Sequence, residues 1–101
     1  MRVWVGADLV AVRTLADGGT LDGARVAAES DDEEHEHEAM LAAAEDGPAV
    51  VVAEVTDGAA EITLRHVRAV HVDTDGSGDL AWFATQEVAA VVEALERRGP
   101  D

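Results

Sequence analysis

The chain is predicted to fold as one α/β or α+β domain, a mixed sheet with about three helices packed on it. Strand-like and helix-like apolar patterns follow one another along its 101 residues. No linker, internal repeat or change of composition separates them. We therefore expect residues 1–101 to form a single small acidic domain with one modest core.

The first strand is predicted at residues 2–5, where successive side chains point to opposite faces. Val3 and Val5 share one face, and Trp4 occupies the other. Residues 24–28 are predicted to form a weak second strand.

A short helix is predicted between these two strands. Asp8 can cap its beginning, and Gly18-Gly19 would end it. The apolar side of this helix carries Leu9, Val12 and Ala16.

A second helix is predicted to begin at a capping box of Ser30 and Glu33 and to run to about Asp46. Its early acidic residues suit the positive end of a helix, whereas the acidic residues at its other end suit it poorly. His37 lies at the edge of its apolar stripe, which comprises Met40, Leu41 and Ala44.

Residues 49–55 are nearly all apolar, which predicts a central strand covered on both faces. The break at Gly47-Pro48 precedes this strand, and a turn at 56–58 follows it. Residues 62–64 and 67–72 then form one bent strand or two short ones.

In the 67–72 segment, the predicted strand places Ala69 and His71 on one face and Val70 and Val72 on the other. A loop is expected at 73–79, followed at 80–83 by a short strand or the entry of a helix.

The last helix has the strongest pattern. Thr85 can cap it, Glu93 and Arg97 can form an ion pair one turn apart, and Gly99-Pro100 ends it. Its apolar stripe comprises Val88, Val91, Val92 and Leu95.

The chain has a formal net charge of −15, with 22 acidic residues and seven arginines but no lysine. This charge argues against direct binding to nucleic acid or an anionic membrane, which requires clustered cationic side chains. It favours a basic partner, cations or a salty medium, although coding bias and salt adaptation would also account for it. The absence of cysteine excludes disulfides and thiolate metal sites. With no signal peptide or membrane-spanning run visible, we expect a cytoplasmic protein.

The most acidic segment predicts an interaction surface at the start of the second helix. Its candidate contact residues are Asp31, Asp32, Glu33, Glu34, Glu36 and Glu38. Rows of carboxylates attract a basic protein surface and can imitate nucleic-acid phosphates. The first hypothesis is therefore a non-enzymatic interaction or regulatory module, with a nucleic-acid mimic as its most specific form.

A second hypothesis is weak calcium binding by the loop at 73–79. The loop resembles the first part of an EF-hand, with candidate oxygen ligands at Asp73, Asp75, Ser77 and Asp79. Ala84 stands where the bidentate glutamate belongs, and the preceding residues predict a strand instead of a helix. The alternative interpretation is an acidic, glycine-rich turn between two strands.

A small enzyme without a recognisable motif is the third hypothesis. Glu34 and His37 have the spacing of a metal-chelating pair on a helix, but the sequence shows no second such pair. His71 is expected to be structural, since no sequence neighbour completes a catalytic triad. A solvent-facing Trp82 would indicate a contact surface. The continuous apolar strand and the valine-rich last helix would also suit the interface of a homo-oligomer.

Several segments together resemble an uncharacterised family of short acidic actinobacterial proteins, a domain of unknown function. They are Met1-Arg2-Val3 and residues 38–43, 50–55, 67–73 and 80–87, of which the last two are the most specific. The region from Leu15 to Ser30 departs from the family pattern. The resemblance implies a bacterial, cytoplasmic origin and transfers no activity or catalytic residue.

Overall fold

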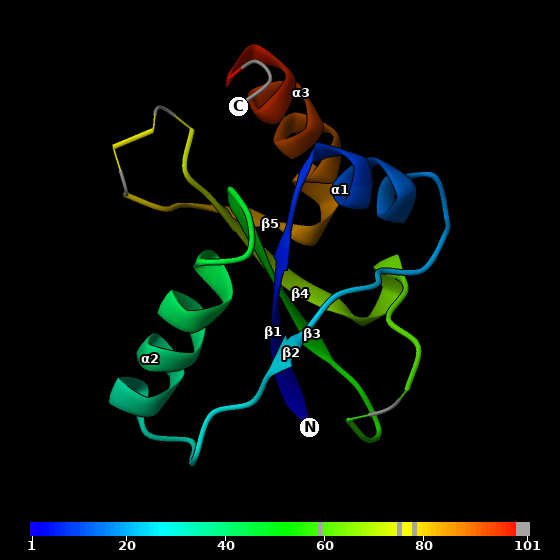
Figure 1. Ribbon diagram of the computed structural model, residues 1–101. Helices are drawn as coiled ribbons and strands as arrows, with labels where there is room; N and C mark the ends of the chain where they lie inside the picture. Colours follow the sequence, from blue (N-terminus) through cyan, green and yellow to red (C-terminus); the bar gives the residue numbers. More distant parts are fainter. Residues whose placement is uncertain (59, 75, 78, 99–101) are drawn as a thin grey trace.

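The computed structural model describes residues 1–58, 60–74, 76–77 and 79–98 (Figure 1). Within these residues one sheet has the spatial order β2-β1-β3-β4-β5. Its strands are β1 (Arg2–Ala7), β2 (Arg25–Val26), β3 (Ala49–Glu54), β4 (Val67–Val72) and β5 (Ala81–Ala84). Every described pairing is antiparallel. The fold is therefore α+β as predicted, but the sheet is antiparallel and not mixed.

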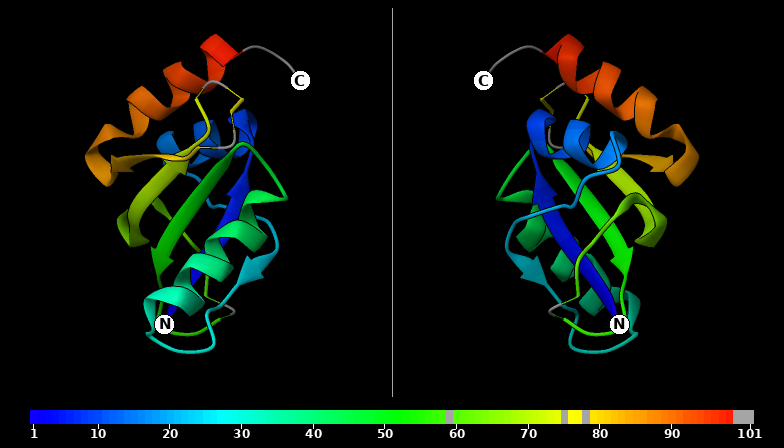
Figure 2. Two further views of the ribbon diagram at one scale, coloured as in Figure 1. Left: turned by 90° about the vertical axis from the view of Figure 1, so that its left-hand side faces the viewer. Right: turned by 90° about the vertical axis from the view of Figure 1, so that its right-hand side faces the viewer.

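Three α-helices cover the sheet in the described chain: α1 (Leu9–Ala16), α2 (Glu33–Ala44) and α3 (Val88–Arg98). Helices α1 and α3 pack against each other on one face, and α2 lies alone on the opposite face (Figures 1 and 2). Two short 3₁₀ turns, η1 (Leu64–His66) and η2 (Thr85–Glu87), precede β4 and α3.

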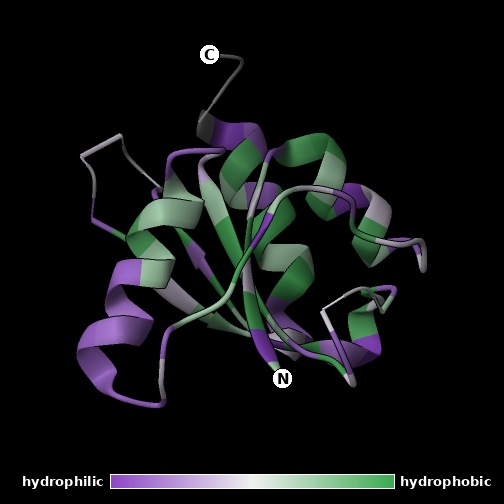
Figure 3. Cartoon of the chain, turned by 60° about the horizontal axis from the view of Figure 1, so that its bottom comes forward, coloured by the Kyte–Doolittle hydropathy of each residue, from purple (hydrophilic) through white to green (hydrophobic). Residues whose placement is uncertain are grey.

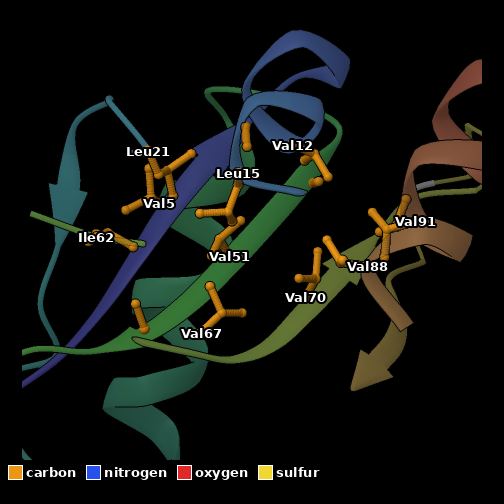
Figure 4. Packing of buried hydrophobic residues seen from close by; sticks show 14 of the residues in the cluster. Val5, Val12, Leu15, Leu21, Val51, Ile62, Val67, Val70, Val88 and Val91 are labelled. Carbon is orange, nitrogen blue, oxygen red and sulfur yellow. The ribbon is translucent and has the colours of Figure 1, made fainter. Parts of the chain in front are cut away.

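The main core lies between the sheet and the α1–α3 pair (Figure 4). Alternate residues of β1, β3 and β4 point into it because side chains in a strand alternate between faces. The largest side chains buried there are Leu15, Ile62, Val3, Val5, Val12, Val51, Val70, Val72 and Val91. This core is almost entirely aliphatic, as the composition requires.

The core under α2 is smaller and contains Trp4, Ala39, Ala43, Val50, Val52 and Ala69. Helix α2 approaches β1 closely at Gly6, where an added Cβ would collide with the Ala43 carbonyl oxygen and lie 2.7 Å from Asp46 Cβ. Small residues on both sides therefore set the depth at which α2 sits on the sheet.

Most predicted elements are confirmed. The Asp8 carboxylate caps α1 by accepting a 2.9 Å hydrogen bond from the Ala11 amide. Residues 49–54 form the central strand, and Ala69 and His71 share the face opposite Val70 and Val72.

The prediction for the start of α2 was wrong. The helix is capped by Asp32, whose carboxylate accepts a 2.9 Å hydrogen bond from the Glu34 amide. Ser30 lies before the cap and accepts a hydrogen bond from the Asp32 amide instead. The helix ends at Ala44, and Leu41 is 51% exposed and does not belong to a buried stripe.

Thr85 does not cap the last helix either. Its hydroxyl donates a 2.6 Å hydrogen bond to the Val67 carbonyl, which ties η2 to the start of β4. The 62–64 segment is not a strand, since Ile62 forms one isolated bridge with Leu21 and η1 follows. No helix within the described residues is long and apolar enough to cross a membrane.

Candidate binding groove

A groove of about 490 Å³ opens where α2 stops covering its face of the sheet. The helix packs on β1, β2 and β3, so the corresponding faces of β4 and β5 lie beyond its flank. The lining residues come from four elements: Arg2, Trp4, Glu33, Glu36, His37, Met40, Val52, Arg68, Ala69 and His71.

Helical spacing explains the α2 wall of the groove. Glu33, Glu36, His37 and Met40 stand at i, i+3, i+4 and i+7, so they share one flank of the helix. Ala39 is buried beneath the helix. The wall is therefore acidic near the start of α2 and apolar at Met40.

The opposite wall comes from β4 and contains an irregularity. Val52 pairs with Ala69, but Ala53 pairs with Val67, so Arg68 is the extra residue of a β-bulge. The bulge allows Arg68 to line the groove together with Ala69 and His71. Strict alternation would place Arg68 on the other face, so the sequence pattern did not indicate it as a groove residue.

Trp82 extends this surface onto β5. It pairs directly with His71 across the two strands and is 60% exposed. Trp4, by contrast, is 95% buried at the floor of the groove. We call the surface formed by Glu33, His37, Met40, Arg68, His71 and Trp82 the groove face.

Charges on the groove walls are unevenly neutralised. Arg2 forms two 3.2 Å ion pairs, one with Glu36 and one with Glu54. Within the described chain, the side chains of Glu33 and Arg68 form no ion pair or hydrogen bond.

Burial lowers the pKa of His71, because a half-buried imidazole is less well solvated when it is charged. The neutral form of His71 is therefore favoured in the folded protein.

The structure divides the six predicted interaction residues into two groups. Asp32 caps α2 and Glu36 pairs with Arg2, so both have local structural roles. The other four are exposed around the first turns of α2: Asp31, Glu33, Glu34 and Glu38. Figure 3 shows these turns as a hydrophilic end of the helix. All four side chains are exposed, and Glu33 also lines the groove.

The predicted calcium loop connects β4 and β5. Asp73 Oδ1 accepts a 2.8 Å hydrogen bond from the Gly76 amide, and Ser77 Oγ accepts one of 3.2 Å from the Asp79 amide. Asp75, like Gly78, lies outside the described residues. The flanking strands agree with the turn interpretation, whereas calcium binding itself stays a prediction.

Sequence reasoning missed a cluster at the start of α2. Ser30 Oγ lies 2.7 Å from His35 Nδ1, and His35 Nε2 lies 3.7 Å from Glu29 Oε2. The order of hydroxyl, imidazole and carboxylate has the form of a nucleophilic triad. However, the cluster is largely exposed, lies outside the groove lining, and its hydroxyl already accepts from the Asp32 amide. We interpret it as part of the helix cap.

The predicted Glu34–His37 pair is divided by the structure, because His37 lines the groove and Glu34 does not. Among the described residues, no group of three or more histidine, aspartate or glutamate side chains is placed to hold a metal ion.

Comparison with known proteins adds no further constraint: no family model, curated protein or solved structure matches the chain. The resemblance to the actinobacterial family stays a prediction.

Proposed function

We propose that this chain is a non-enzymatic protein-interaction module that binds a basic partner on the groove face. The observation that carries the proposal is the position of the groove, which lies between the acidic first turns of α2 and the exposed Trp82. The acidic turns thus lie beside an apolar hollow, whose β4 wall carries one positive charge at Arg68.

The apolar part of this surface supports a docking role. Trp82 and Leu41 are two of the few large apolar side chains that are exposed in the described chain. Leu41 follows His37 by one helical turn but does not line the groove, so it lies beside the groove face. Tryptophan is enriched among the residues that contribute most binding energy at protein interfaces. A partner could insert an apolar side chain over Met40 and cover Trp82.

The acidic part of the surface supports a basic partner. Four exposed carboxylates surround the beginning of α2, and the whole chain carries a net charge of −15. Such a field accelerates encounter with a positively charged protein. Salt screens it over about 10 Å at 0.1 M ionic strength, so binding should weaken as salt is added.

The proposal is tested by capture from a bacterial lysate at low and at high salt. The variant is E33Q/E34Q/E38Q, and the control D22N/E45Q/E61Q removes the same charge from exposed positions elsewhere. We expect basic proteins to bind at low salt, to be lost at high salt, and to bind the first variant much less than the control.

A partner list without basic proteins, or equal loss in both variants, would contradict the proposal. Captured partners should then be challenged with duplex DNA. Competition between DNA and the chain would identify the nucleic-acid mimic as the specific form of this function.

A further inference from the structure

We infer that the basic partner docks as an extended segment that pairs with the free edge of β5 and extends the sheet by one strand. This inference rests on the proposed function and specifies how the partner is bound. The partner segment is an alternating sequence of basic and apolar residues.

Backbone geometry shows which groups of β5 face outward. The Ala84 amide donates a 2.9 Å hydrogen bond to Glu87 Oε1 and therefore points away from β4. The backbone N–H and C=O of one strand residue point to the same side, and they alternate along an antiparallel strand. The N–H and C=O of Trp82 consequently point outward as well, whereas those of Ala81 and Phe83 point to β4.

The edge of β5 is short, with four residues, but it carries none of the side chains that prevent strand pairing. Natural edge strands are often protected by lysine, proline or inward-pointing charges, as well as by being short. β5 has the sequence Ala-Trp-Phe-Ala and occupies one end of the sheet order. Glu87 occupies the outward amide of Ala84, so Trp82 carries the outward amide of β5 that stays open for pairing.

Side chains on the two faces of β5 offer different contacts to an added strand. Trp82 is on the groove face next to His71, so every second residue of the partner would lie against it and extend toward the groove. Phe83 packs against the main core on the opposite face. An extended segment can therefore pair with the edge while its side chains contact Trp82, the part of the groove face that lies on β5.

The charges near β5 select a basic segment over a second copy of the chain. Asp73 and Asp79 precede the strand in the connecting loop, and Glu87 follows it. Basic side chains of a partner would lie close to carboxylates at both ends of the edge. Two copies of a chain with a net charge of −15 would instead repel each other.

The test uses two synthetic peptides of equal length and charge with the full chain. One alternates arginine and valine and is extended, whereas the other is an alanine–arginine helix. We expect the extended peptide to bind at least about tenfold more tightly, a difference of about 1.4 kcal/mol. We also expect it to slow hydrogen exchange of the Trp82 amide. N-methylation of alternate amides along one edge of the extended peptide should abolish both effects.

Chain variants provide the second measurement. W82T removes the indole but keeps the outward amide, whereas W82P removes both, and proline is tolerated at an outward-facing edge position. We expect W82P to bind the extended peptide more weakly than W82T. Thermal unfolding of both variants shows whether each remains folded, and the N-methylated peptides give the answer should W82P unfold.

The outcomes separate the two proposals. Equal affinity for both peptides, with unchanged exchange at Trp82, would overturn strand pairing while leaving the basic-partner proposal intact. Failure of both peptides to bind at low salt would contradict both proposals.

Discussion

The two faces of the sheet differ in what covers them. Helices α1 and α3 close one face over a cluster of 17 buried residues in the described chain, whereas α2 covers the other over six. The six include three alanines, and the helix above them leaves the groove open beside β4. Stability should therefore come mainly from the first face, whereas the second face carries the surface proposed to bind a partner.

The largest effect is expected from Leu15→Ala, which leaves a cavity in the fully buried main core. Such a substitution typically costs about 2–5 kcal/mol. Met40→Ala removes a similarly large side chain from the half-buried wall of the groove and should cost less than half as much. Urea unfolding of both variants measures the difference, and equal losses would contradict the contrast between the faces.

A smaller loss is expected from Gly6→Ala, at the contact of α2 with β1. The added methyl group would collide with the Ala43 carbonyl, so α2 must shift, at a cost of about 1–3 kcal/mol. The shift should change the groove, which is seen as NMR shift changes at His37 and Met40. Gly76 has open space around it, but its φ of +79° is unfavourable for alanine, so Gly76→Ala is not a matched control. Ala42→Gly serves as the control instead. It lies on the exposed side of α2, changes helix propensity alone and should leave the groove signals in place.

Local patterns along the chain were sufficient to predict much of this fold. The capping of α1 by Asp8, the valine stripe of α3 and the alternation around His71 each depend on neighbours in sequence. The cap of α2 was misassigned because both Ser30 and Asp32 can accept a backbone hydrogen bond at this position, and in the structure Asp32 is the cap. The sequence pattern alone does not show which of two neighbouring cap residues a helix uses.

The groove could not be predicted because it depends on distant contacts. Its existence requires β1 to pair with β3, α2 to cover only part of the sheet, and a bulge to bring Arg68 to the groove face. The sequence identified some of its members individually, namely His37, His71 and Trp82. Helical spacing could place His37 beside Glu33 and Glu36, but the sequence contained no signal that His71 and Trp82 lie on the same surface.

A third comparison uses two neighbours on β5. Trp82 is exposed on the groove face, and Phe83 is half-buried against the main core. Trp82→Ala should cost only about 0.5 kcal/mol, the size of a cross-strand contact. Phe83→Ala should cost several times more, because it removes a side chain from the main core. Thermal unfolding distinguishes them, and a larger loss at Trp82 would show that the groove face contributes to stability.

The smallest expected effect is the contribution of His71, on the groove face, to the pH dependence of the stability of the chain. Burial places the pKa of His71 in the folded chain below its ordinary value of about 6.5. Between these two pKa values the unfolded chain binds the proton more readily, so stability decreases as pH falls from about 6.5 through the folded pKa. Above about pH 6.5 His71 is neutral in both the folded and the unfolded chain, so it no longer changes the stability with pH.

The many carboxylates of the chain also titrate toward acid, so His71 must be isolated by difference. The stability of the parent chain minus that of His71→Gln should be constant above pH 7 and should decrease as the solution is made more acidic. A difference that stays constant from pH 8 to pH 5 would contradict the burial of this imidazole. A partner that covers the groove face should enlarge the decrease, since it removes more water from His71 and disfavours its charged form further.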